Sequence, residues 1–230
     1  MNYDWNFARL APYWKAFLAG TETTLLLSVV VIVFGTLLGI GGGLMLRRRT
    51  ASVVLYPIVD VIRALPPLVL ILFMYFFLTA QVIGTTIEAF WVYSIAMSLN
   101  LAAFTSDLVR SALQNVPGGA VDAGRALGMS RSQIGRYIVF PHILRELVPA
   151  MVVLYIGMLK MSSLASVINV REVVYTAQTV MTDISRSLEA WVVVALIYVV
   201  LVIPPTYVAR RIERWAHRGS QRADDHEHHV

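Results

Sequence analysis

Long apolar segments separated by short polar stretches dominate the pattern of this chain of 230 residues. A helix needs about 20 apolar residues to cross the hydrocarbon core of a bilayer. Five segments meet that requirement, and they cover residues 23–46, 53–78, 87–106, 147–167 and 191–208. The pattern therefore predicts an all-α integral membrane protein whose transmembrane domain covers residues 23–209.

Glycine recurs at every fourth position near the end of the first segment, at Gly35, Gly39 and Gly43. Residues with this spacing lie on one face of a helix, and small residues there allow a second helix to approach closely. We expect this face to pack against another spanning helix.

The second segment contains Pro66 and Pro67, which remove backbone donors and should break or kink the helix. Arg63 precedes this break, and a charge at membrane depth is costly and commonly functional. Broken helices also frame transport sites. Arg63 and Pro66 are therefore candidates for a substrate pathway or gate. The alternative is that Arg63 pairs with Asp60 or extends to the interface.

The fourth segment carries Lys160 near its end, followed by Ser162 and Ser163. These side chains are candidates for attracting a substrate carboxylate or for gating. Alternatively, Lys160 reaches the interface with its long stem. Asp107 and Arg110, at the end of the third segment, are expected to form a local pair three residues apart.

The two ends of the chain differ from the apolar centre. Residues 1–22 are rich in aromatic side chains, which favour the headgroup level, so we expect an interfacial segment. A sixth span there is the alternative. Residues 210–230 form a tail that ends in a polar stretch, which we expect to be disordered. Its histidines lack the geometry of a metal site, so no metal is predicted; they are His226, His228 and His229.

Composition supports a location within the lipid bilayer, because 57% of the residues are hydrophobic and only 14% are charged. Soluble domains carry about 25% charged residues. The chain has no cysteine, which excludes disulfides, thiolate nucleophiles and cysteine zinc sites.

Basic residues are distributed unequally among the polar stretches. Of the 19, 13 lie at residues 47–49, in the loop 109–145 and in the tail 210–230. Basic loops stay on the cytoplasmic side. We therefore expect the N-terminus outside, the C-terminus in the cytoplasm and an odd number of spans.

The loop 109–145 contains signals for two short helices. Residues 120–127 are helix formers that end at Gly128, a natural helix terminus, and Ser130 with Gln133 forms a capping box. Pro141 should end the second helix. One apolar face is expected from Leu127, Ile134 and Ile138.

This loop has two interpretations. Its glycine turn is similar to that of a DNA-binding helix-turn-helix. A connection between two spans has little room to enter a DNA groove, so no nucleic-acid partner is expected. The favoured interpretation is a docking element for a soluble partner, with its apolar face filling a groove and its charges fixing the register.

The stretch "VDAGRALGMSRSQIGRYIVFP" resembles the EAA loop of ABC-importer permeases. The spacing of that signature matches Asp122, Ala123, Gly124, Gly128, Ile138 and Pro141. The resemblance implies that these residues form the coupling helix, which sits in a cleft of the nucleotide-binding subunit. The chain departs from the pattern at three positions, with Asp122 for Glu, Gly124 for Ala and Phe140 for Leu.

Other stretches resemble the polar amino-acid permease subfamily, among them "TETTLLLSVVVIVFGTLLG", "RALPPLVLILFMYF" and "LKMSSLASVI". The resemblance implies a type I ABC-importer transmembrane domain in the bacterial inner membrane. It also implies three partners: a dimer of ATP-binding subunits, a second permease subunit, identical or paralogous, and an extracytoplasmic solute-binding protein.

The chain lacks an ATPase site of its own. A P-loop requires a lysine directly after a glycine, and neither Lys15 nor Lys160 follows one. No catalytic residue and no cofactor are therefore predicted here; ATP and Mg²⁺ would bind the partner subunit. The alternative function is a stand-alone secondary transporter or channel, which the scarcity of intramembrane carboxylates disfavours.

Overall fold

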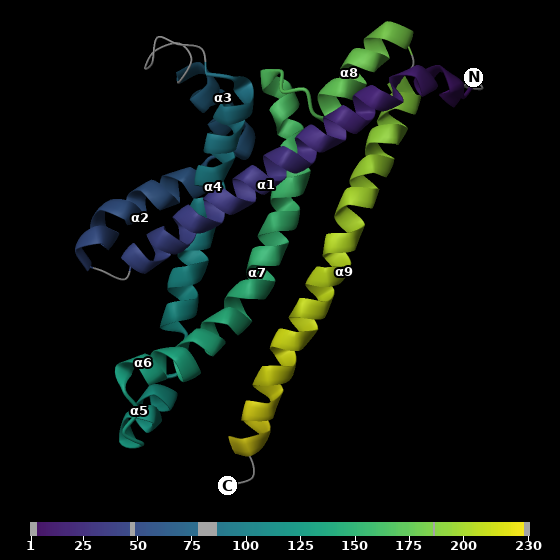
Figure 1. The fold of residues 1–230 in the computed structure, drawn as a ribbon. Coiled ribbons are helices and arrows are strands. Elements are labelled where there is room, and N and C mark those ends of the chain that lie inside the picture. Colours follow the sequence, from purple (N-terminus) through teal and green to yellow (C-terminus); the bar gives the residue numbers. More distant parts are fainter. Residues whose placement is uncertain (1–3, 47–48, 78–86, 186, 228–230) are drawn as a thin grey trace.

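The computed structural model describes residues 4–46, 49–77, 87–185 and 187–227, and the regular structure of this part of the chain is helical (Figure 1). Within these residues, four helices are long and apolar enough to cross a membrane: Phe7–Met45, Ala89–Gln114, Arg131–Ile168 and Ser187–Arg214. A bent pair, Thr50–Ala64 and Pro67–Phe77, adds a fifth crossing if it counts as one span. The all-α membrane architecture is thus confirmed.

The first spanning helix begins well before residue 23, where the predicted apolar segment starts. A short 3₁₀ helix, η1 (Phe7–Tyr13), leads directly into α1 (Trp14–Met45). The aromatic N-terminal segment therefore continues into the first span and forms no separate crossing among the described residues. In Figure 1, α1 runs obliquely across the other helices.

The glycine face of α1 packs against α4 (Ala89–Gln114), as predicted. A Cβ atom built on Gly35 would lie 2.8 Å from the Leu101 side chain, and one on Gly43 would lie 2.6 Å from Cβ of Val109. Real Cβ atoms essentially never come this close to another atom. The glycines therefore set the distance between these two helices.

The predicted break in the second apolar segment is present. α2 (Arg49–Ala64) and α3 (Pro67–Phe77) meet at an angle of 109° around Leu65 and Pro66. Proline lacks a backbone N–H and disfavours helix in the residue before it, so the chain turns here. Leu78, the last residue of the predicted segment, lies outside the described residues.

The last part of the chain forms α7 (Phe140–Met161), the 3₁₀ turn η4 (Ser162–Ile168), α8 (Val173–Ile184) and α9 (Ser187–Glu227). α9 continues through Pro204 and Pro205 and past Arg214, the last residue of its candidate span. The prediction of a disordered tail is wrong as far as Glu227, because the arginines, alanines and glutamate that follow are good helix formers. His228 and His229 lie outside the described residues.

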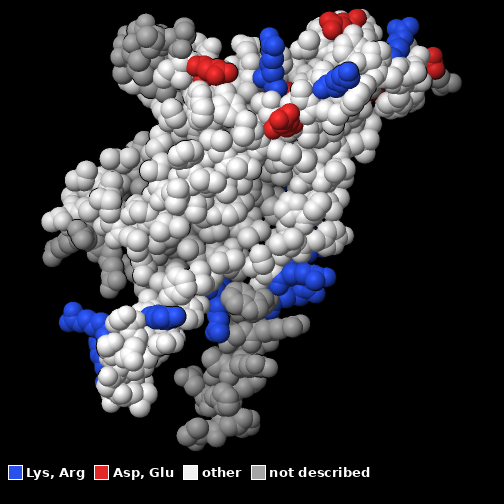
Figure 2. Space-filling model, viewed as in Figure 1, with Lys and Arg blue, Asp and Glu red and all other residues white. Residues whose placement is uncertain are grey.

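Two buried clusters hold the helices together. The larger, at the crossing of α1, α3, α4 and η4, includes Leu27, Ile71, Tyr93, Met97 and Ile168. The smaller joins η1, α1, α8 and α9. Between the two ends of the molecule, the surface in Figure 2 is a broad band without charged side chains. Large apolar side chains are exposed on the spanning helices, such as Leu37 of α1 and Val200 of α9, and they indicate contact with lipid.

Candidate functional site

A helical hairpin projects from the membrane bundle at the end opposite α8 (Figure 1). It consists of α5 (Gly118–Ala126), a turn, and α6 (Arg131–Ile134), which continues as a π-helical turn over Gly135–Val139. This hairpin contains the residues that match the coupling signature.

The turn after α5 is a Schellman motif, in which two amides past the helix bond back to carbonyls of its last turn. The Gly128 N–H donates to the Arg125 carbonyl, and the Met129 N–H donates to the Gly124 carbonyl, both at 3.0 Å. Gly128 has φ of +74°, a conformation that glycine adopts without strain. The predicted role of Gly128 at the helix end is confirmed.

The second helix of the hairpin starts as the sequence predicts. The Gln133 N–H donates to the Ser130 hydroxyl, and the Ser130 N–H donates to the Gln133 side-chain oxygen. This capping box satisfies amides at the helix start. On α5, Arg125 and Asp122 form an exposed ion pair at 2.8 Å, while Ala123 is exposed.

The inner face of the hairpin is closely packed around Gly124. A Cβ atom at Gly124 would lie 2.8 Å from Cδ1 of Ile138 and 3.3 Å from the buried side chain of Ile134. Glycine at this position thus lets α5 approach α6 and the π turn. It gives a physical reason for the departure from alanine in the signature.

Two expectations about the hairpin are wrong. Leu127 does not share the face of Ile134 and Ile138, because it caps α5 before the turn and is 82% exposed. Pro141 does not end the second helix, since α7 begins at Phe140 and continues through it. The Phe140 N–H bonds to the Gly135 carbonyl across a widened π turn, which leaves room for the proline ring.

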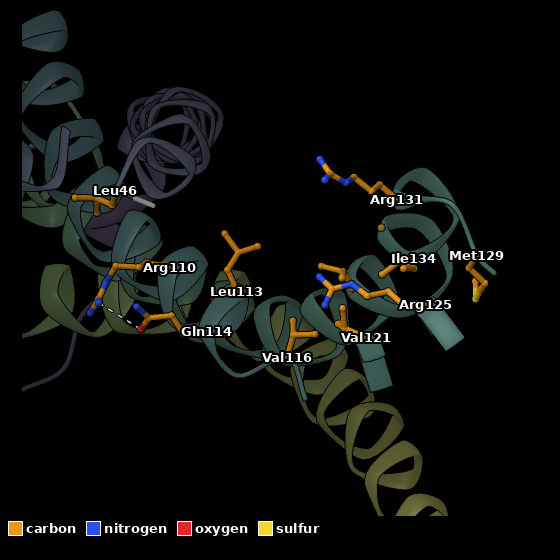
Figure 3. A pocket seen from close by; sticks show the side chains of 12 residues that line it. Leu46, Arg110, Leu113, Gln114, Val116, Val121, Arg125, Met129, Arg131 and Ile134 are labelled. Carbon is orange, nitrogen blue, oxygen red and sulfur yellow. Dashed lines mark hydrogen bonds between the residues drawn. The ribbon is translucent and has the colours of Figure 1, made fainter. Parts of the chain in front are cut away.

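A cavity of about 970 Å³ separates the hairpin from the ends of α1 and α4 (Figure 3). Its wall contains three arginines, Arg110, Arg125 and Arg131, and one polar amide, Gln114. The rest of the wall is almost entirely apolar. We call this cavity the arginine pocket; its other lining residues are Leu46, Leu113, Val116, Val121, Met129, Ile134, Gly135 and Val139.

Arg63 pairs with a helix that is distant in sequence. Its guanidinium lies 3.0 Å from Asp107 of α4, which also binds Arg110 at 3.2 Å. The Asp107–Arg110 pair is as predicted, whereas the alternative pairing of Arg63 with Asp60 does not form. Arg63 also lies over the ring of Phe104, at 5.3 Å from the centroid. This cluster ties the end of α2, next to Pro66, to α4.

Lys160 and Ser163 line a shallow groove of about 480 Å³ between the end of α7 and α9. Tyr198 of α9 lines the same groove. Ser162 is buried beside it, and its hydroxyl lies 3.2 Å from the Tyr198 hydroxyl. The structure thus brings Lys160, Ser162 and Ser163 together. Arg63 and Pro66 are not among the described residues that line this groove.

The structure adds a buried carboxyl group that the sequence reasoning missed. Glu172 caps α8 by accepting a hydrogen bond from the Tyr175 N–H at 2.8 Å, and it is fully buried. The Tyr198 hydroxyl lies 3.5 Å from its second oxygen. Burial raises the pKa of Glu172 to about 7, although these hydrogen bonds oppose the shift. Its position before the apolar run at Val173 was the signal available.

Among the described residues, no group of three or more histidine, aspartate or glutamate side chains lies together as metal ligands would. His226 lies in the helical backbone of α9, near its end.

Comparison with known proteins covers nearly the whole chain, including the hairpin. The family described as binding-protein-dependent transport system inner membrane component matches residues 15–218, from α1 into α9 and including the hairpin. The chain belongs to this family. It is therefore the inner membrane permease of a binding-protein-dependent transport system.

Curated relatives match this permease over almost its full length. The glutamine transport system permease protein GlnP of Escherichia coli (strain K12) is 30% identical, over 93% of this chain and 98% of its own length. The arginine transport system permease protein ArtQ of Bacillus subtilis is also 30% identical, over 93% and 97%.

Solved structures share the fold. A crystal structure of an amino acid ABC transporter with histidines matches the permease with a TM-score of 0.83 at 29% identity, covering 93% of this chain and 99% of that one. The MetNI methionine ABC transporter in an inward-facing conformation matches with a TM-score of 0.71 at 25% identity, over 89% and 98%. The predicted importer fold is confirmed.

Proposed function

We propose that this permease is the membrane subunit of an ATP-driven importer for a polar amino acid or a related small solute. The proposal depends on one observation. The second helix of the hairpin, α6, is the first part of the continuous helical segment Arg131–Ile168. The relatives named as glutamine and arginine permeases support the substrate class.

In this proposal, the hairpin transmits the motion of its partner to the spanning helix. Because α6, the π turn and α7 form one continuous helical segment, displacement of the hairpin moves the distant end of that segment. That end carries Lys160 and Ser163, beside a groove large enough for a small solute. Docking of a partner at one end of the permease is thereby coupled to a groove at the other end, whose mostly apolar wall carries Lys160, Ser163 and Tyr198.

ATP and Mg²⁺ bind a separate dimer of ATP-binding-cassette subunits, which docks on the hairpin. Leu127 supports this assignment, because an apolar side chain with 82% exposure at a projecting turn fits a groove on a partner. The exposed pair Asp122–Arg125 next to it fixes the register. The coupling residues are Asp122, Ala123, Gly124, Gly128, Ile138 and Pro141.

The hairpin and the C-terminal end of α9 face the cytoplasm, and the N-terminus lies outside. Figure 2 supports this orientation: basic side chains gather at the hairpin end, whereas acidic and basic side chains mix at the opposite end. An excess of arginine and lysine marks the cytoplasmic side.

The remaining partners follow from the family. A solute-binding protein delivers substrate to the outer end, near α8, and a second permease subunit, identical or paralogous, completes the pathway. Lys160 attracts the substrate carboxylate, and Ser163 lies beside it. Arg63 and Pro66 shape the pathway from the broken segment α2–α3.

The decisive experiment places a charge on the hairpin tip. We expect Leu127→Asp to weaken association with the ATPase subunit about tenfold or more, because it puts a carboxylate into an apolar docking groove. Gln178→Asp adds the same charge on an exposed position of α8, at the opposite end, and is the matched control. Co-purification with the ATPase subunit measures both variants, and binding-protein-stimulated ATP hydrolysis in proteoliposomes tests the wild-type complex.

The outcomes separate the parts of the proposal. Equal behaviour of Leu127→Asp and Gln178→Asp would show that the hairpin tip does not dock the ATPase. If a panel of amino-acid-loaded binding proteins fails to stimulate hydrolysis in a complex that does assemble, the substrate class is wrong and the docking assignment stands.

A further inference from the structure

The arginine pocket is distinct from the hairpin tip and from the groove near Lys160. It lies between the hairpin and the ends of two spanning helices, at Leu46, which caps α1, and at Gln114, the last residue of α4 (Figure 3). Its volume of about 970 Å³ is at the upper end of the range of about 300–1,000 Å³ for small-molecule sites. A ligand there would sit at the level where these spans leave the bilayer.

The charge of the pocket is one-sided. Three guanidinium groups line it, and no aspartate or glutamate is among the described residues that do so. Arg110 is paired with Asp107 and Arg125 with Asp122, so Arg131 is the arginine of this wall that has no acidic partner among the described residues. In Figure 3, Arg125 extends from the hairpin toward Val116 and Leu113, and Arg131 extends toward the same side of the view but apart from Arg125. The side chain of Arg131 makes no ion pair or hydrogen bond with any residue in the described part of the chain. Its five donors are thus available to an anion.

The remaining wall is apolar, with Leu46 and Leu113 on the side of the bundle and Val121 and Ile134 on the hairpin. The last turn of α1 also exposes Leu44 and Met45, which belong to the lipid-facing surface. An amphiphile satisfies both parts of such a site, because its charged head meets the arginines and its apolar part meets the leucines.

We propose that the arginine pocket binds an anionic phospholipid from the leaflet on the hairpin side. Arg131 holds the phosphate of the headgroup, and Arg125 and Arg110, which keep their pairs with Asp122 and Asp107, contribute positive charge to the wall. The glycerol and the first acyl carbons lie against Leu46 and Leu113. Such a lipid bridges the hairpin to the membrane bundle and limits how far the hairpin moves.

The pocket fits a lipid better than it fits the two other anionic ligands. A free phosphate would leave the apolar wall in contact with water. An acidic segment of the ATPase subunit would reach the exposed tip at Leu127, which is not part of this wall. The proposal does not depend on transport, since its readout is bound lipid.

The test measures lipid binding to the purified full-length permease by native mass spectrometry. Phosphatidylglycerol and phosphatidylcholine with identical acyl chains are titrated against the wild type, Arg131→Gln, and Arg125→Gln/Arg131→Gln. The control is Arg136→Gln/Arg145→Gln, which removes the same charge from exposed arginines that do not line the pocket.

We expect the wild type and the control to prefer phosphatidylglycerol, and the pocket double variant to bind it roughly tenfold more weakly or worse. Arg131→Gln should show part of this loss. Its side chain has no ion pair or hydrogen bond to lose within the described part of the chain, so the substitution should leave the fold intact. Circular dichroism monitors the fold of the double variant.

Three results would overturn the proposal. The first is an equal loss in the pocket and control variants, which would indicate diffuse attraction to basic surface. The second is displacement of phosphatidylglycerol by millimolar inorganic phosphate, which would indicate a free-anion site. The third is its displacement by the ATPase subunit at stoichiometric concentration, which would assign the pocket to that protein.

Discussion

Single glycines determine how closely two spanning helices approach. On the face of α1 that meets α4, residues of α4 occupy the space that a side chain would need at Gly35, Gly39 and Gly43. Gly41 lies in the same helix but has open space around it. The glycine pattern is therefore a packing requirement at some positions and incidental at others.

Gly43→Ala should destabilise the permease by about 1–3 kcal/mol, because the new methyl group would overlap Val109 and the carbonyl of Ser106. Gly41→Ala is the control and should be neutral or slightly stabilising, since alanine has the higher helix propensity. The midpoint of thermal unfolding in detergent measures both. A matching loss in Gly41→Ala would contradict the packing argument.

The buried carboxyl group of Glu172 makes stability depend on pH. Its pKa in the folded protein, about 7, exceeds its ordinary value of 4.5, so the folded state holds the proton more tightly than the unfolded state. The penalty for ionisation is absent below pH 4.5. It grows as pH rises through 7.

We expect the stability of the wild type to fall by about 3 kcal/mol between pH 4.5 and pH 8 on account of this group. Glu172→Gln should flatten the curve over that range. Glu88→Gln, which changes an exposed acid, should keep the wild-type slope. Denaturation midpoints against pH measure the three curves, and parallel curves for the wild type and Glu172→Gln would rule out this role.

At the scale of elements, an ion-pair cluster fixes the broken segment to the bundle. Asp107 of α4 is the shared carboxylate of Arg63 from α2 and Arg110 from its own helix. Within the described residues, Nε of both arginines is buried without a hydrogen-bond partner. Loss of the carboxylate would leave two partly buried cations facing each other.

Asp107→Asn should therefore destabilise the permease by about 1–3 kcal/mol. Asp60→Asn, at an exposed site on α2, should change the stability by less than about 0.5 kcal/mol. A double-mutant cycle of Arg63→Gln with Asp107→Asn should give a coupling energy of about 0.5–3 kcal/mol. Additive effects would mean that the contact does not join α2 to α4.

In the hairpin, some features of the helices depend only on residues that are close in the chain. The turn at Gly128 and the capping box of Ser130 involve residues at most five positions apart, so the sequence predicted the helix end at Gly128 and the capping box. The path of the helix through Pro141 depends on a π turn. Nothing in the local pattern distinguishes a proline that ends a helix from one that a widened turn accommodates.

At the scale of the whole molecule, orientation follows from the distribution of charge. The absence of native cysteine allows a direct test, because a single introduced thiol is the only site for a maleimide. Gln178→Cys on α8 and Ser132→Cys on α6 are both at exposed positions, at opposite ends of the molecule.

In intact spheroplasts, a membrane-impermeant maleimide should label Gln178→Cys and leave Ser132→Cys unlabelled. Both should react after permeabilisation, which controls for accessibility of each thiol. The reverse pattern would place the hairpin outside the cell and would refute docking of a cytoplasmic ATPase.

The sequence by itself determined the class of the protein, the number and approximate position of its apolar segments, the break at Pro66–Pro67 and the hairpin signature. Each of these depends on composition, on periodicity or on residues close in the chain. Local preferences are strong enough there to decide the outcome.

Only the tertiary structure decided the partner of Arg63, the burial of Glu172, the exposure of Leu127 and the arginine pocket. Arg63 was expected to pair, if at all, with its neighbour Asp60, yet Asp107 of another helix is its partner. These features depend on which helices meet and at what distance. Close helix packing sets those distances, and it joins residues far apart in the chain.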